Sequence, residues 1–232
     1  MSSTPERFEE QDDLDYELQD QLDFSVITMG MKNLPFFEDD TFLGMQAINV
    51  GIVDAVLTSQ EYALLRRQFD EERTPADLAH TTSALSQMWI LGIYEVVRMW
   101  RDRRYEFKKL CDAGGIDAKI THLQSNEEAN ATVLIRRDQL KKYRDETSYR
   151  DRIEKAWERL EPVYRMIELF RMNLAKHASP GKDAVIPRAP GYGRINRWCG
   201  SIDFELVDKE GHYHTINRRD IANALRAMLK EA

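Results

Sequence analysis

Arg171 and His177 are the residues of the chain whose types and spacing are best suited to chemistry. A histidine exchanges a proton near neutral pH, and an arginine can hold a phosphate, or its transition state, through two donors. Together they suit metal-free cleavage of an RNA phosphodiester, in which the 2′-hydroxyl attacks. The alternative is a surface histidine beside an arginine whose stem packs on the protein while its charge reaches water.

The element that must position both residues is a helix, predicted to begin near Thr147 or Ser148 and to run to His177. Steps of four and three place seven of its residues on one stripe, six of them apolar or aromatic. They are Ile153, Trp157, Leu160, Tyr164, Ile167, Arg171 and Leu174. A cation on a core-facing stripe needs a partner or an open cleft, since burying it unpaired would cost several kcal/mol.

The spacing of Arg171 and His177 also constrains the site. Six residues of helix rotate a side chain by about 240°. The two side chains therefore share a site only if the helix ends between them or if a second subunit completes the site. Ser179-Pro180-Gly181 is predicted to end the helix just beyond His177.

A second long helix is predicted to start with Thr74 as its cap and Pro75 in its first turn, and to end before Gly114. Its middle, residues 88–100, is apolar nearly all round, which predicts a central helix. Glu95 and Arg98 lie three apart inside it, and two readings are open. They form a structural ion pair, or Glu95 serves as a partner of Arg171 or of a bound substrate.

The remaining segments complete a mainly α fold. Helices are predicted over residues 41–58, 61–69, 116–126 and 127–143. After a proline- and glycine-rich loop, three short strands are predicted over 194–199, 201–207 and 212–216. Asn217 is expected to cap a last helix over 218–230. The fold class is thus a helical bundle with a small C-terminal antiparallel three-stranded appendage and a terminal helix.

Composition predicts three regions in a soluble, cytoplasmic protein. The 232 residues are 42% hydrophobic and carry a net charge of −7. Residues 1–40 hold twelve acidic and two basic side chains, a charge of −10, so the other 192 residues carry +3. Residues 1–24 are expected to form an acidic flexible arm, 25–181 the bundle and 182–232 the appendage. The start lacks the features of a signal peptide, and the two cysteines predict no disulfide framework.

Further residues are candidates for binding a substrate. Lys176 adjoins the predicted catalytic pair, and Arg188, Tyr192 and Arg194 combine a ring for stacking with cations for phosphates. Alternatively, the loop that contains these residues is a turn that packs the strands on the bundle. His212 and His214 point to one face of a strand, and we expect cross-strand polar contacts there rather than a metal pair. No metal site or cofactor is predicted.

The segment RMNLAKH, residues 171–177, resembles the arginine, four to six residues, histidine motif of the HEPN superfamily (higher eukaryotes and prokaryotes nucleotide-binding domains). The resemblance covers roughly residues 41–180 and implies a helical bundle whose long helix ends in the motif. It implies a metal-independent endoribonuclease of a toxin–antitoxin or defence system, with Arg171 on the phosphoryl group, His177 moving protons and Asn173 orienting substrate or His177. In the family a polar residue usually follows the arginine, whereas here Met172 does.

The partners are predicted from the same observations. The apolar helix at residues 88–100 and the 240° offset predict a homodimer with the site near its interface, and RNA is the expected ligand. Some members of the family are binding modules without activity. The alternative is therefore a non-catalytic helical module that binds a nucleotide or a protein partner.

Overall fold

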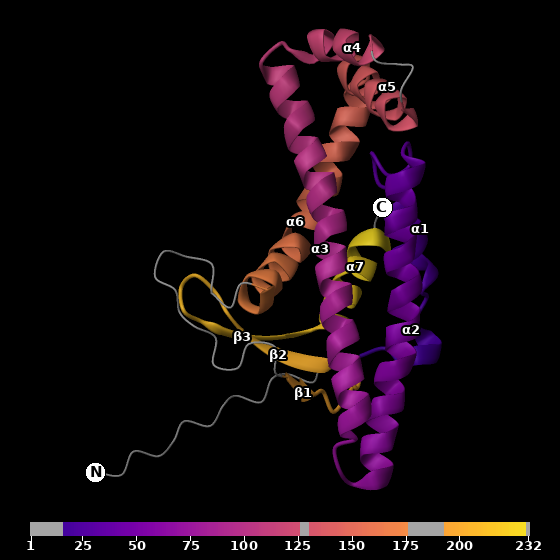
Figure 1. The fold of residues 1–232 in the computed structure, drawn as a ribbon, viewed down its shortest axis with the longest axis vertical. Coiled ribbons are helices and arrows are strands. Elements are labelled where there is room, and N and C mark those ends of the chain that lie inside the picture. The colour runs from indigo at the N-terminus through magenta and orange to yellow at the C-terminus, as the bar shows by residue number, and fades with distance from the viewer. Residues whose placement is uncertain (1–15, 126–129, 176–192, 231–232) are drawn as a thin grey trace, which may run out of the picture.

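The computed structural model describes residues 16–125, 130–175 and 193–230 (Figure 1). It confirms the predicted fold class, a mainly α fold with a three-stranded antiparallel sheet followed by a terminal helix. In chain order the elements are α1 (Ser25–Lys32), α2 (Thr41–Glu71), α3 (Ala76–Asp112), α4 (Ile116–Gln124), α5 (Ala131–Asp145), α6 (Thr147–Ala175), β1 (Gly193–Ile195), β2 (Ile202–Val207), β3 (Tyr213–Asn217) and α7 (Arg218–Lys230).

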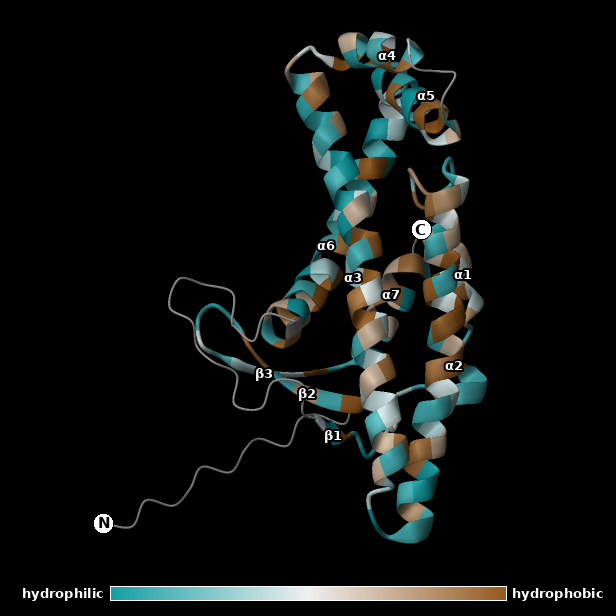
Figure 2. Cartoon of the chain, viewed as in Figure 1, coloured by the Kyte–Doolittle hydropathy of each residue, from teal (hydrophilic) through white to brown (hydrophobic). Residues whose placement is uncertain are grey.

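Helix α3 is the central helix, as predicted. It packs against α2 on one side and α6 on another, and α4 and α5 close one end of the long α3–α6 pair (Figure 1). Two tryptophans tie it to its neighbours: Trp89 Nε1 donates to the carbonyl of Val50 at 2.9 Å, and Trp100 Nε1 donates to that of Pro35 at 2.6 Å. Towards α4 the helix becomes more hydrophilic (Figure 2, teal), and most of its core residues lie between Trp89 and Trp100, although Phe107 is also buried in the core.

Several predicted boundaries were wrong. The pieces predicted over 41–58 and 61–69 form one helix, α2, which begins where the Asp40 carboxylate accepts hydrogen bonds from the amides of Phe42 and Leu43. Thr74 does not cap α3, because Pro75 occupies the capping position and makes no side-chain cap bond. Helix α1 was not predicted at all, although it buries Ile27 and Met31 completely.

The stripe predicted on α6 is confirmed. Ile153, Leu160, Tyr164, Ile167 and Leu174 are buried in the core, and Trp157 packs against it. The helix begins at Thr147 as predicted, and its described part ends at Ala175. Arg171, the cation of the stripe, is only half-buried, so it lies at the edge of the core.

The sheet has the order β1-β2-β3, with β2 in the middle. Ile202, Phe204 and Leu206 of β2 are buried and alternate with partly exposed residues, as the period-two pattern predicts. After β3 the Asn217 Oδ1 accepts from the Asp220 amide at 2.9 Å, and the Asp220 carboxylate accepts from the Asn217 amide at 3.0 Å. This reciprocal cap confirms the predicted start of α7.

The ends of the described chain share the core of the bundle. Residues of β2 and α7 belong to the same cluster of buried side chains as the helices. At the other end Leu22 is buried, and the Tyr16 hydroxyl donates to Asp220 Oδ1 at 2.7 Å and accepts from Asn217 Nδ2 at 3.1 Å. Residues 16–24 of the predicted arm therefore pack on the folded body, while residues 1–15 lie outside the described residues.

Helix α2 is long and apolar enough to cross a membrane by length and composition alone. Within this fold, however, α2 packs against both α1 and α3. Two of its charged residues, Asp54 and Glu61, are fully buried and paired with an arginine of α7. Its apolarity is therefore at least partly that of a core helix.

Candidate functional site

Arg171 extends from the last turns of α6 onto α3. Its guanidinium carbon lies 4.7 Å from the centre of the Tyr94 ring, a distance that suits a cation–π contact. Within the described part of the chain, no carboxylate forms an ion pair with Arg171, and no side chain accepts a hydrogen bond from it. A half-buried arginine that rests on a ring, with no counter-charge among the described residues, is suited to receive an anion.

The ring under Arg171 belongs to a chain of stacked groups along the seam between α3 and α6. The Tyr94 and Tyr164 rings stack with centroids 5.7 Å apart and 25° between their planes, and Arg101 lies 4.7 Å from the Tyr164 ring. The Tyr164 hydroxyl donates to Glu168 at 3.0 Å. Burial, followed by its hydrogen bonds to Tyr94 and Glu168, raises the pKa of Tyr164 well above its usual value, so this hydroxyl stays protonated at neutral pH. The stacking holds in place the Tyr94 ring, on which Arg171 lies.

Asn173 is fully buried and joins α6 to the sheet. Its Oδ1 accepts from the amide of Val207 at 2.8 Å, and its Nδ2 donates to the carbonyls of Val207 and Leu169, both at 2.9 Å. The side chain satisfies both backbone groups of the last residue of β2. These contacts hold the end of α6 against the sheet. Both N–H groups of the Asn173 amide are used in them, so neither faces solvent.

Among the described residues, Glu95 forms no ion pair with Arg171. It is exposed, and its carboxylate accepts from Arg98 at 2.6 Å in an i,i+3 pair, while Arg98 also binds Asp102 at 3.0 Å. Of the two readings of Glu95, the geometry fits the structural ion pair on the surface of α3. A direct role of Glu95 on substrate stays a prediction.

The remaining predicted site residues are only partly described. Lys176, His177, Arg188 and Tyr192 lie outside the described residues. Arg194 is exposed on β1, with one nitrogen 3.6 Å from Glu205. It lines a cleft of about 500 Å³ between the sheet and the α2–α3 hairpin, together with Gln68, Thr74, His80, Ser83 and Ile202.

Arg194 and Arg171 do not share one described cavity. Arg194 pairs in register with Asp203 near the start of β2, whereas Asn173 of α6 binds Val207 at its end. The four residue steps from Asp203 to Val207 correspond to roughly 13 Å of strand. The described residues of the predicted site thus lie apart, near opposite ends of β2. Residues 176–192 connect these ends in the sequence.

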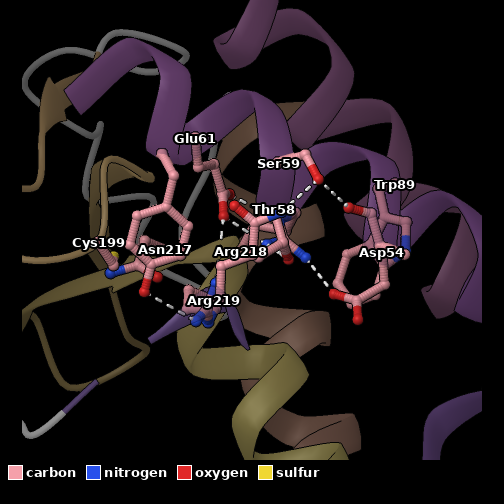
Figure 3. A network of polar contacts seen from close by, with 12 residues as sticks. Asp54, Thr58, Ser59, Glu61, Trp89, Cys199, Asn217, Arg218 and Arg219 are labelled. Carbon is pink, nitrogen blue, oxygen red and sulfur yellow. Dashed lines mark hydrogen bonds and ion pairs between the residues drawn. The ribbon is translucent and has the colours of Figure 1, made fainter. Parts of the chain in front are cut away.

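Sequence reasoning missed a buried network of charges between α2 and α7 (Figure 3). Arg218, fully buried, donates to Glu61 Oε1 at 2.6 Å and to Thr58 Oγ1 at 3.0 Å, and it also forms an ion pair with Asp54. Arg226 pairs with the same Asp54 carboxylate. The feature of the sequence that could have indicated this network was Asp54, the single charged residue between positions 41 and 60.

The electrostatics of this network are those of a structural clamp. Burial alone would lower the pKa of Arg218, but the charges of Glu61 and Asp54 outweigh burial and raise it. Burial lowers the pKa of Arg226, and Asp54 offsets this only in part. The network fixes α7 on α2. Gly200, in the turn between β1 and β2, packs on the same helix, where a Cβ would lie 2.0 Å from the Glu61 carbonyl oxygen.

A smaller polar cluster lies on the β2–β3 hairpin. His214 Nε2 lies 2.8 Å and His212 Nδ1 lies 3.3 Å from Asp208 Oδ2. The bond with His214 is the largest influence that lowers the pKa of Asp208. In the parts of the chain that the structure describes, no group of three or more His, Cys, Asp or Glu side chains has the geometry of a metal site. The two histidines thus make polar contacts with one carboxylate.

Comparisons with known proteins add no family to this picture: no family model matches the chain, and no curated protein or solved structure matches it.

Proposed function

We propose that the protein is a cytoplasmic, HEPN-like protein that binds RNA at the end of α6 and cleaves it without a metal ion. One observation carries the proposal. Arg171 is the only cation on the core-facing stripe of α6, it is half-buried on the Tyr94 ring, and no described carboxylate neutralises it. A cation in this position, where leucine would extend the apolar stripe, suits a ligand better than it suits the stability of the helix packing.

In the proposed reaction Arg171 binds the non-bridging oxygens of the scissile phosphate, where negative charge develops. His177 takes the proton of the attacking 2′-hydroxyl. The 2′-oxygen bonds to phosphorus as the bond from phosphorus to the 5′-oxygen breaks. The leaving oxygen takes a proton from water, and the hydroxide that remains takes the proton held by His177. The products end in a 2′,3′-cyclic phosphate and a 5′-hydroxyl. Asn173 acts as a positioning residue, because its amide holds the last turns of α6 on β2.

A non-catalytic binding module of the same architecture is the second candidate. The observation that favours it is that Asn173 is fully buried and uses both N–H groups of its amide on the carbonyls of Val207 and Leu169, so it has none to donate to a substrate. In that case Arg171 would still bind an anionic ligand. The homodimer predicted from the sequence belongs to both candidates as a proposal.

The test is binding of a fluorescent single-stranded RNA in EDTA, measured by anisotropy for wild type, Arg171→Ala and Arg165→Ala. Arg165 is the matched control, because it lies on the same helix, is 75% exposed and, among the residues that the structure describes, pairs with Glu161 alone. We expect Arg171→Ala to weaken binding at least tenfold and Arg165→Ala to leave it nearly unchanged. Equal affinities of wild type and Arg171→Ala would refute a site at the end of α6.

A further inference from the structure

The exposed face of α2 carries an apolar stripe that only Asn49 interrupts, although surface residues of soluble proteins are mostly polar. Phe42 is 58% exposed, Met45 49%, Ile52 54% and Val56 60%. Their steps of three and four, with Asn49 completing the series, place them on one face over four helical turns. Val53, 42% exposed, flanks them. We define these six residues as the α2 stripe.

The α2 stripe is also free of charge. From Thr41 to Gln60 the only charged residue is Asp54, which is fully buried and paired with Arg218 and Arg226 inside the chain. The chain as a whole is 31% charged. A partner recognised through charge would find nothing to bind on this face, so its partner must present an uncharged apolar surface of similar length.

We propose that a second copy of this chain covers the α2 stripe, with the two α2 helices packed antiparallel across a two-fold axis. The stripe spans fourteen residue steps, about 21 Å of helix. Asn49 stands at its midpoint, so an antiparallel pair brings Asn49 next to its own copy. An amide both donates and accepts, and two copies of Asn49 therefore satisfy each other at the axis. A single polar residue in an apolar interface is a known means of fixing register.

The size of the surface fits this occupant. Large side chains offer roughly 150–250 Å² each when aromatic and less when aliphatic, so five of them half exposed present on the order of 400 Å². This is within the range of the largest apolar patches on monomers, which are commonly interaction sites. The flanking residues at 46, 48, 55 and 59 extend it towards the roughly 800 Å² per partner of a standard interface.

This inference gives the homodimer an interface on α2, in place of the interface near Arg171 that the sequence predicted, and it does not depend on the RNA chemistry. The α2 stripe lies on a helix that packs against α1 and α3, whereas Arg171 lies at the seam of α3 and α6. A loss of dimerisation and a loss of RNA binding are therefore expected from different substitutions, and the failure of one proposal leaves the other standing.

Sedimentation equilibrium at micromolar concentration tests the proposal. Wild type should have twice the chain mass of 27.1 kDa, and Ile52→Glu should have the mass of a single chain with an unchanged helical circular dichroism spectrum. Phe69→Glu is the control, since Phe69 is 84% exposed on the same helix but outside the α2 stripe, and it should remain a dimer. A monomeric wild type or a dimeric Ile52→Glu would overturn the proposal.

A second measurement does not depend on how Ile52→Glu folds. Asn49→Cys should cross-link to its own copy on mild oxidation, and Phe69→Cys should not. The absence of an Asn49→Cys cross-link would overturn the two-fold arrangement. Flotation with phosphatidylcholine vesicles completes the test, because a monomer that floats with lipid would assign the face to a membrane surface and not to a second copy.

Discussion

Replacing Arg171 by leucine separates a functional arginine from a structural one. The contact of Arg171 with the Tyr94 ring is partly solvent-exposed and should contribute about 0.5–1 kcal/mol. Leucine has a helix propensity close to that of arginine and adds apolar surface to the stripe between Ile167 and Leu174. Since no described carboxylate is left without its partner, the free energy of unfolding should change by less than about 1 kcal/mol.

RNA binding should respond differently to Arg171→Leu. A hydrogen bond to a charged group contributes about 1.5–3 kcal/mol, which corresponds to roughly a tenfold to hundredfold loss of affinity. Urea denaturation measures the first quantity and RNA anisotropy the second on the same preparation. A destabilisation of more than about 2 kcal/mol would identify Arg171 as a structural residue. Unchanged RNA affinity would refute its assignment to a binding site.

The other predictions concern stability and burial. Arg218→Leu should destabilise the fold by about 3–5 kcal/mol in urea denaturation, because two buried carboxylates lose a partner, while the exposed Arg165→Leu should cost less than about 1 kcal/mol. Tyr16→Phe should cost about 1–3 kcal/mol in the same assay, since it removes the hydroxyl bonded to Asp220, and an unchanged midpoint would show that residue 16 is dispensable. Cys199 is fully buried and burial raises its pKa to about 12, so a thiol reagent at pH 8 should label it only on unfolding, as peptide mass spectrometry would show.

Periodicity was sufficient to predict the elements that carry long apolar stripes. The stripe on α6 and the alternation on β2 each follow from side chains that must face one core, and Asn217 with Asp220 spelled out the start of α7. Helix α1 escaped prediction because it is short and contains Gly30, a residue that disfavours helices. Tertiary packing explains the glycine at this position, because a Cβ at Gly30 would lie 2.8 Å from the Leu229 side chain of α7.

Only part of the candidate site could be predicted, because some of its contacts also depend on tertiary structure. The exceptional position of Arg171 follows from spacing along one helix, which the sequence displays. The contact of Arg171 with the Tyr94 ring and the pairing of Arg218 with Glu61 each join residues that are far apart in the chain. Which carboxylate meets which arginine depends on how helices are arranged, and single-sequence patterns carry no information on that. Asn173 illustrates the limit, because a residue predicted to orient substrate or His177 proved to bind the backbone of β2.

The most direct test of the proposed activity is cleavage of a single-stranded RNA in EDTA by wild type and by His177→Ala, with a matched oligonucleotide that lacks the 2′-hydroxyls. The proposal predicts fragments that end in a 2′,3′-cyclic phosphate from RNA, none from the 2′-deoxy oligonucleotide, and loss of cleavage in His177→Ala with RNA binding retained. Cleavage of the deoxy oligonucleotide, or cleavage by His177→Ala at the wild-type rate, would contradict it. Binding without any cleavage by wild type would leave the non-catalytic module as the function.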